Sequence, residues 1–364
     1  MRHHDRPTAL ARALTRRELL VAGGRLGVAG ALAAAGLASG AAVLPSAVRA
    51  QGGGATIGFL ATRPAGDRGA MDDMLAALER AKTDLGVATT VVTAVAPAGQ
   101  EASIRRLAQA GADIVAVTFE AVDTALGTVA AEFPGTRFIG IGGGASAAPL
   151  ANVVSVSFDT YLGAYLVGVL CGHATVTRQL GYLGGISAPD TNAAANALAQ
   201  AAADVDPSIV VTPGFVGSFA DAEAGRLVAD RLYAAGVDLL MTDAGASDLG
   251  AIDAALAAGS YLVAGSESVV DLAPASVVAT LAVLYGEALY EQLRSALDGA
   301  WMGGHQRSGI ADGMIDLIVS DRFLAEGPAD MTERIRNAAG PMDDARQAII
   351  TGSLVPAYVP LPPA

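Results

Sequence analysis

Short apolar runs alternate with amphipathic segments through most of this chain. Thr56–Ala61, Val153–Phe158 and Leu239–Thr242 have the length of strands, and a segment with apolar residues at helical spacing follows each of them. Strands that are apolar at consecutive positions are buried on both faces, as in parallel sheets covered by helices. The alternation therefore predicts an α/β fold. About ten strand candidates exceed what one ordinary sheet holds, so we expect two sheets in two lobes with a ligand cleft between them.

The alternation changes after Gly265. The spacing of apolar residues predicts one long helix over Ala275–Ala296 and a final helix over Ala329–Thr351, interrupted near Gly340–Pro341. Between these helices, Arg307–Asp321 is expected to form two short strands.

The stretch Val216–Gly250 combines a helix, a strand and a polar loop. Ser218, with Asp221 three residues later, predicts a helix start of the capping-box type, and Gly236 is placed to end that helix. An apolar strand follows, and Asp243 and Gly245 come directly after it. Because ligands of open α/β sheets bind beyond the carboxyl ends of strands, this loop and the nearby Phe219 are candidate ligand contacts.

Two further loops end strands in the same way. Asp67 and Arg68 lie between the first strand and the first helix, and Phe119 ends the third strand. Both positions would face a cleft at the carboxyl edge of the sheet. For the loop of Asp67 and Arg68, the alternative is a plain turn that leads into a helix. For Phe219, the alternative to a ligand contact is a core contact beside the start of a helix.

The first fifty residues have the composition of an export signal. Arg16 and Arg17 form the adjacent pair of a twin-arginine signal, an apolar run follows from Leu26 to Leu44, and small residues end at Ala50. We predict a cleaved signal peptide over residues 1–50 and a periplasmic location. The alternative is an uncleaved membrane anchor, because the apolar run is long enough to span a bilayer.

The sequence contains a single cysteine, Cys171. It lies far from the predicted cleavage site, so we do not expect a lipoprotein. One cysteine cannot form an internal disulfide. Its apolar helical surroundings predict a buried and inert thiol.

The chain is acidic, with 23 Lys and Arg against 36 Asp and Glu and a formal net charge of −13. Residues 1–50 hold seven of the arginines, so removal of this segment would leave a more acidic protein. Such a surface repels nucleic acids and anionic membranes, and we expect no nucleic-acid partner.

Motifs that carry chemistry are few. His173 and His305 are isolated, which argues against a zinc site, and we find no nucleophile elbow. Gly140–Ala145 is glycine-rich, but a strand rather than a helix follows it, so a connection is favoured over a dinucleotide-binding loop. We expect no catalytic residues, no metal and no cofactor, and therefore no enzyme.

Four stretches of the chain together resemble one family. They are Asn152–Gly163 with Leu166–Gly172, Leu180–Ile186, Phe215–Gly250 and Ile349–Pro356. They are similar to the basic-membrane-protein family of periplasmic substrate-binding proteins, relatives of the purine-nucleoside receptors of ABC transporters. The resemblance covers nearly all of residues 55–360.

The resemblance implies the type I periplasmic binding fold, with two Rossmann-like lobes joined by a three-strand hinge. Lobe 1 would comprise residues 55–157 and about 272–306, and lobe 2 residues 158–271 and about 307–325. Residues 326–364 would form a C-terminal helix and an extended tail.

The resemblance also implies a function without catalysis. A monomeric solute-binding protein would bind a small polar ligand, a nucleoside or purine-like compound, in the interlobe cleft and deliver it to an ABC permease. Two other functions stay open. One is a ligand-sensing module for a membrane receptor, and the other is a secreted α/β enzyme that processes nucleosides.

The family's ligand contacts carry over to individual positions. Asp67 falls on the acidic loop residue, Arg68 stands where a lysine is usual, and Phe219 matches a stacking aromatic. Ala70 and Met71 stand where nucleoside binders have Phe and Asn.

In the second lobe, Gly245 matches a backbone contact. Ser266 stands where the family has an aspartate for the ribose, with Glu267 beside it as a substitute. The candidate ligand-binding residues are therefore Asp67, Arg68, Phe119, Phe219, Asp243, Gly245, Ser266 and Glu267.

Overall fold

The computed structural model describes residues 54–94, 96–144 and 150–363. The export signal predicted over residues 1–50 lies outside the described residues, as does the end of the predicted glycine-rich connection.

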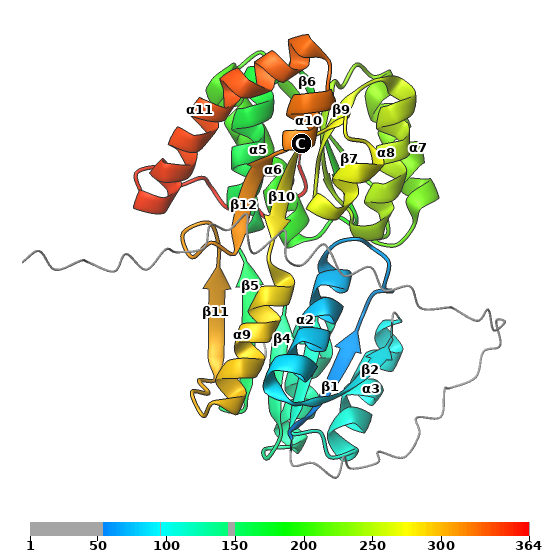
Figure 1. The fold of residues 1–364 in the computed structure, drawn as a ribbon, viewed down its shortest axis with the longest axis vertical. Helices are drawn as coiled ribbons and strands as arrows, with labels where there is room; N and C mark the ends of the chain where they lie inside the picture. Colours follow the sequence, from blue (N-terminus) through cyan, green and yellow to red (C-terminus); the bar gives the residue numbers. More distant parts are fainter. Residues whose placement is uncertain (1–53, 95, 145–149, 364) are drawn as a thin grey trace, which may run out of the picture. The chain divides into compact units, whose positions relative to one another are not determined.

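One sheet of the described part has six strands in the order β11-β5-β4-β3-β1-β2, and every neighbouring pair is parallel. Its strands are β1 (Thr56–Ala61), β2 (Ala88–Thr93), β3 (Ile114–Thr118), β4 (Arg137–Ile141), β5 (Val153–Phe158) and β11 (Gly304–Ser308). The helical segments of this lobe are α2 (Ala70–Leu85), α3 (Pro97–Gln109), η1 (Val122–Leu126), α4 (Gly127–Glu132) and α9 (Tyr285–Leu297). Helices α2 and α9 lie side by side (Figure 1).

The other sheet also has six strands, in the order β12-β10-β9-β8-β6-β7, and only β12 runs antiparallel to its neighbour. Its strands are β6 (Gln179–Gly184), β7 (Val210–Phe215), β8 (Leu239–Asp243), β9 (Tyr261–Ala264), β10 (Val277–Val283) and β12 (Ile315–Val319). The helical segments are α5 (Thr160–Ala174), α6 (Pro189–Val205), α7 (Ala222–Ala234), η2 (Gly245–Ser247), α8 (Asp248–Ala258), η3 (Glu267–Leu272), α10 (Asp321–Glu326) and α11 (Ala329–Thr351).

Consecutive strand residues pack into different hydrophobic clusters. In β8, Leu239 and Met241 join the cluster that contains residues of α5 and α6, whereas Leu240 joins the cluster of α7 and α8. Burying an apolar side chain of this size stabilises the fold by about 1.5–3 kcal/mol. Consecutive apolar residues of a strand are therefore buried on both faces of the sheet, which explains why the strands are apolar at consecutive positions in the sequence.

The helix within Val216–Gly250 begins differently from its prediction. Asp221, not Ser218, is the N-cap of α7, because its Oδ1 accepts a hydrogen bond from the Ala224 N–H at 2.9 Å. Ser218 instead accepts from the Ala220 N–H at 3.0 Å, which closes the turn before the helix. Gly236 follows the last turn with φ of 97°, so the predicted helix end is confirmed.

The long helix predicted over Ala275–Ala296 is wrong. Val277–Val283 forms β10, which pairs with β9 and β12, and α9 begins only at Tyr285. This run is rich in β-branched residues and is buried at six of its seven positions, as a central strand requires. Because β10 belongs to the second sheet, the boundary predicted near residue 272 has to move to about Leu284.

The last helix differs from its prediction at one point. Helix α11 has the predicted bounds but continues through Pro341 without a break. Its neighbours Ala338 and Met342 are buried in the core, and this packing outweighs the one backbone hydrogen bond that proline cannot donate.

The chain crosses between the sheets after β5, after β10 and after β11. The crossings are bonded to one another. The Asp159 N–H donates to the Ser308 carbonyl at 2.8 Å, and the Leu284 N–H donates to the Met314 carbonyl at 2.9 Å. The two lobes are therefore joined by adjacent, mutually bonded backbone segments.

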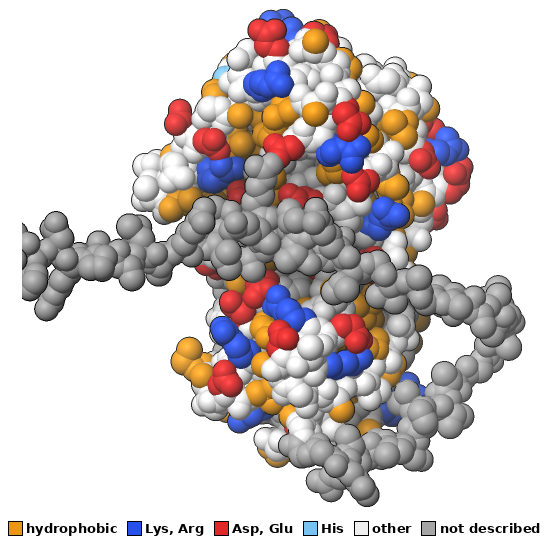
Figure 2. Space-filling model, viewed as in Figure 1, with side chains coloured by type: hydrophobic (Ala, Val, Ile, Leu, Met, Phe, Trp, Pro, Cys, Tyr) orange, Lys and Arg blue, Asp and Glu red, His pale blue; other side chains and the backbone are white. Residues whose placement is uncertain are grey.

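Three further features bear on the predictions made from the sequence: surface charge, membrane-spanning helices and the burial of the cysteine. Figure 2 shows acidic and basic side chains interspersed on one face, without a continuous basic patch there. Among the described helices, none combines the length and apolar character that a membrane span requires. Cys171 is buried as predicted, and burial raises the pKa of its thiol.

Candidate ligand-binding cleft

A cleft of about 100 Å³ lies at the carboxyl ends of strands from both sheets. Seven of the predicted contacts line it, namely Asp67, Arg68, Phe119, Phe219, Asp243, Gly245 and Ser266. Glu267 is exposed at the start of η3 and does not line the cleft formed by the described residues. The strand-end rule thus brings together residues that are up to about two hundred positions apart in the sequence.

The first loop of the cleft is organised by Asp67. Its carboxylate accepts hydrogen bonds from the backbone N–H groups of Gly69 at 2.9 Å, Met71 at 3.0 Å and Asp72 at 3.2 Å. These donors open α2, where the helix dipole also favours a negative charge. Asp67 therefore sets the shape of the loop, and most of its accepting capacity is used within the protein.

Arg68 connects this loop to the other lobe. Its Nη1 donates to the Ser268 carbonyl at 3.3 Å, and the Ser268 hydroxyl donates to the Arg68 carbonyl. Arg68 also has a positive φ of 51°, a conformation uncommon for residues other than glycine. The predicted contact thus lies at a point where the lobes touch.

Two phenylalanines from different lobes face the cleft, and glycines make room for both. Phe119 has φ of 48° and lies against Gly142, where an added Cβ would be 2.7 Å from the ring. Phe219 lies against Gly185, where an added Cβ would be 2.3 Å from the ring. Phe219 is half-buried and lines the cleft, so the alternative of a pure core contact is not what the structure shows.

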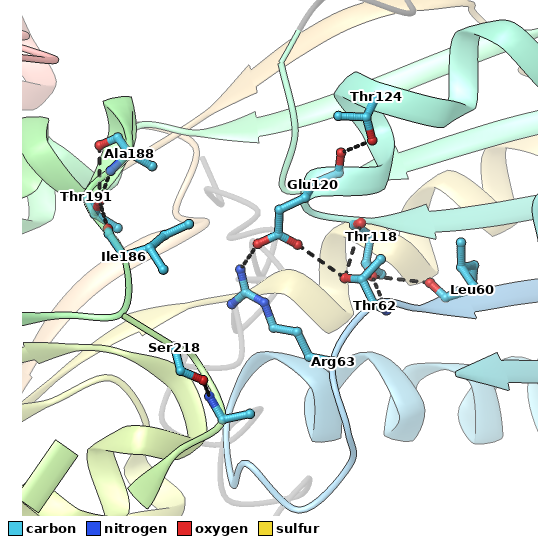
Figure 3. Close-up of polar contacts among 11 residues, drawn as sticks. Leu60, Thr62, Arg63, Thr118, Glu120, Thr124, Ile186, Ala188, Thr191 and Ser218 are labelled. Atoms are coloured by element: carbon cyan, nitrogen blue, oxygen red, sulfur yellow. Dashed lines mark hydrogen bonds and ion pairs between the residues drawn. The ribbon is translucent and has the colours of Figure 1, made fainter. Parts of the chain in front are cut away.

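The guanidinium of Arg63 occupies the space beside these rings. Its carbon lies 3.9 Å from the ring centroid of Phe119 and 3.8 Å from that of Phe219. Its Nη2 donates to Glu120 Oε1 at 2.7 Å (Figure 3). Arg63 was not among the predicted contacts, although it stands two residues after β1, where the strand-end rule places ligand contacts.

Half-buried carboxylates of the second lobe form another part of the cleft wall. Asp243 Oδ2 accepts a hydrogen bond from the Tyr182 hydroxyl at 2.7 Å, and Asp248 Oδ1 accepts one from the Ala244 N–H at 2.9 Å. Burial, and then the charge of Asp243, raise the pKa of Asp248. Asp248, the first residue of α8, was not among the predicted ligand contacts.

Tyr285 and Asp73 also line the cleft. The pair Asp72 and Asp73 on one helix predicts a solvent-exposed face, and Asp73 is indeed exposed, whereas Tyr285 was not among the predicted contacts. Tyr285 begins α9 and makes edge-to-face contacts with Phe119 and Phe158, at centroid distances of 5.6 and 4.6 Å. Asp73 lies in the first turn of α2, directly after the loop of Asp67 and Arg68, whereas Tyr285 begins the helix that follows β10.

The stability of the unliganded protein is expected to depend on Asp243 and pH. Burial raises the pKa of Asp243 to about 6, against smaller opposing effects of Tyr182 and Arg63. In the unfolded chain the pKa of an aspartate is about 3.9, so the folded protein holds the Asp243 proton more tightly than the unfolded chain does. The resulting stability is fully present below about pH 3.9 and is lost as pH rises through about 6, where the half-buried carboxyl group has to ionise. Asp243→Asn keeps an acceptor for Tyr182, so we expect it to stabilise the protein by about 1 kcal/mol above pH 6 and little near pH 4.

Melting temperatures of the wild type and of Asp243→Asn between about pH 4 and 8 measure this difference. Asp298→Asn, at the exposed end of α9, is the control for removing one acidic charge. A stability difference that stays constant across this range would contradict the burial of the Asp243 charge.

Neither of the two described histidines, His173 and His305, lines the cleft. The ring nitrogens of His305 lie 2.9 and 3.1 Å from the hydroxyls of Ser155 and Ser157, outside the cleft. Within the described ranges, no group of three or more His, Cys, Asp or Glu side chains is arranged to hold a metal ion.

Two solved structures that share this architecture are described as ABC transporter solute-binding proteins. One from Aeropyrum pernix K1 superposes with a TM-score of 0.74, is 17% identical, and covers 84% of this chain and 94% of its own. One from Conexibacter woesei superposes with a TM-score of 0.64, is 21% identical, and covers 84% of this chain and 99% of its own. At these identities the likeness shows the fold alone, and it confirms the predicted periplasmic-binding-protein fold.

A family model described as "ABC transporter substrate-binding protein PnrA-like" matches residues 55–337. The chain therefore belongs to this family of substrate-binding proteins, which is not a family of enzymes. The predicted resemblance to basic membrane proteins is confirmed as well.

Curated relatives align over part of their length. Basic membrane protein A of Borreliella burgdorferi is 34% identical over 141 residues, which is 38% of this chain and 42% of that protein. Basic membrane protein B of Borrelia garinii subsp. bavariensis is 28% identical over 179 residues, which is 47% of this chain and 52% of that protein. The chain thus matches about half of the length of these relatives.

Proposed function

We propose that this chain is the extracytoplasmic solute-binding protein of an ABC importer. It binds a small polar ligand with a flat ring, a nucleoside or purine-like compound, in the cleft and delivers it to a permease. The observation that carries this proposal is the pair Phe119 and Phe219, one from each lobe, which both contact one flat group, the guanidinium of Arg63. A flat heterocycle would use the same apolar ring faces.

Polar groups beside the rings would hold the rest of the ligand. Asp243 and Ser266 line the cleft near Gly245, whose φ of 60° keeps the backbone close to Phe219. Buried hydroxyl groups of a ligand need such partners, because a buried polar group without a hydrogen bond costs about 1–3 kcal/mol.

Transport would use closure of the two lobes. The three crossings are short and bonded to one another, which suits a hinge that bends at a few residues. A ligand that contacts both lobes stabilises the closed form by its differential affinity for it. The closed, monomeric protein would then be recognised by the permease, and the export signal predicted in residues 1–50 would place it outside the cytoplasm.

Native mass spectrometry of the exported full-length protein tests this function, because tight binders often retain their ligand. A nucleoside and nucleobase panel then follows, with thermal melting and a turnover assay. A true ligand at one hundred times its Kd is expected to stabilise the protein by about 2.7 kcal/mol, without being consumed. A folded protein that retains nothing and is stabilised by no compound would refute the proposal, and turnover of a nucleoside would indicate an enzyme instead.

A further inference from the structure

The charges that line the cleft do not balance. Four aspartates line it, namely Asp67, Asp73, Asp243 and Asp248, against the two arginines Arg63 and Arg68. Arg63 in addition forms its ion pair with another acid, Glu120. Burial raises the pKa of Asp243 to about 6 and also raises that of Asp248, because no cation among the described residues compensates these carboxyl groups fully. A bound cation would stabilise their ionised form, so the walls of this cleft favour a positive charge.

The aromatic faces favour a positive charge as well. Each ring presents a negative face, and a cation placed over it gains about 0.5–2 kcal/mol, more when water is excluded. The guanidinium of Arg63 makes this contact with Phe119 and Phe219 together. The guanidinium of Arg63 thus shows that a flat cation fits between the two rings.

Apart from its two ring contacts, the guanidinium of Arg63 has few polar partners among the described residues. Its Nε is buried and has no hydrogen-bond partner among the described residues, and its one ion pair joins it to Glu120, whose side chain is 42% exposed. Partly exposed ion pairs contribute only about 0–1 kcal/mol, and a buried donor without an acceptor is unfavourable. An occupant with better partners could therefore take its place.

We propose that the ligand of this cleft carries a flat, positively charged group, which displaces the guanidinium of Arg63 from Phe119 and Phe219. This inference rests on the proposed solute-binding function and specifies its ligand class. The acidic wall formed by Asp243 and Asp248 compensates the charge of the ligand. Arg63 leaves toward Glu120 and solvent, so in the empty protein it competes with the ligand for the rings.

Two isomeric nucleosides test the charge requirement. 1-Methyladenosine is a cation near neutral pH, whereas N6-methyladenosine has the same composition and a neutral base. We expect calorimetry on the full-length protein to show at least tenfold tighter binding of 1-methyladenosine. Equal affinity, tighter binding of the neutral isomer, or no binding of the cation would overturn the proposal.

Variants of Arg63 test the competition. Arg63→Gln removes the resident guanidinium and is expected to tighten binding of 1-methyladenosine about fivefold. Arg80→Gln is the matched control, because Arg80 also lies over an aromatic ring, Tyr290, at 3.6 Å and pairs with Glu287 at 2.8 Å, but outside the cleft. We expect Arg80→Gln to leave the affinity unchanged.

Weaker binding by Arg63→Gln would mean that Arg63 contacts the ligand, and it would overturn the competition. If Arg63→Gln does not fold, as judged by circular dichroism, Arg63→Lys takes its place, since lysine keeps the charge and loses the flat group. Failure of the ligand class is distinct from failure of the function. If a neutral compound of the panel binds and the cation does not, the cationic ligand class is refuted but the solute-binding function is not. If no compound binds the folded protein, the solute-binding function is refuted as well.

Discussion

Gly250→Ala is expected to destabilise the protein by about 3 kcal/mol or more, the upper range for overpacking a closed interior. Gly250 lies in α8, where an added Cβ would be 1.7 Å from the Ala222 carbonyl oxygen and 2.7 Å from the Arg226 nitrogen. Both obstacles are backbone atoms of α7, so no side chain can rotate away. The two helices would have to separate, which would open the cluster that covers one face of the second sheet.

Chemical and thermal unfolding of the purified variant measure this loss. Gly99→Ala is the matched control, because Gly99 is also helical but has no atom within 4 Å of an added Cβ. Alanine is the better helix former, so the control should be neutral or slightly stabilising. If Gly250→Ala has the same melting temperature as the wild type, the close approach of α7 and α8 is not present in solution.

Phe219→Ala is expected to weaken ligand binding more than tenfold while the protein stays folded. The ring of Phe219 lies in the cleft, and loss of one stacking ring costs roughly 1–3 kcal/mol where a base rests on it. Because the side chain is only half-buried, its removal leaves a small cavity and a modest loss of stability.

Calorimetry with the retained ligand, or with adenosine and guanosine, measures the change in Kd. Phe133→Ala is the control, since Phe133 is also half-buried but does not line the cleft. It packs on the hydrophobic cluster of the first lobe that contains residues of α3, η1 and α4. An unchanged Kd in Phe219→Ala would remove this ring from the site, whereas equal losses in both variants would point to a general effect on folding.

Local sequence patterns predicted most of the elements. The bounds predicted for the strands Thr56–Ala61 and Val153–Phe158 and for the helix Ala329–Thr351 agree with the structure. In each, the period of apolar residues matches one type of element, and polar or glycine residues mark its ends. Val277–Val283 was assigned wrongly because its identity as a strand comes from partners β9 and β12, which lie elsewhere in the sequence.

The candidate site was predicted in outline. Phe119 follows β3, Asp243 ends β8 and Phe219 lies in the loop after β7, and the strand-end rule places such residues at one edge of a sheet. Glu267 also follows a strand, but the backbone of η3 turns it to the surface. The rule thus predicts which loops meet at the cleft, while the direction of each side chain depends on the conformation of its loop.

The sequence by itself determined the alternation of strands and helices, the two-lobed fold class and the family, since these follow from local periodicity and from residues that are adjacent in the chain. The tertiary structure alone decided that Arg63 reaches two rings from different lobes, and that Asp248 joins Asp243 in one wall. The reason is physical, because charge compensation and ring contact act through space. They depend on distances of a few ångströms between side chains, whether the residues lie far apart in the sequence, as Arg63 and Phe219 do, or close together, as Asp243 and Asp248 do.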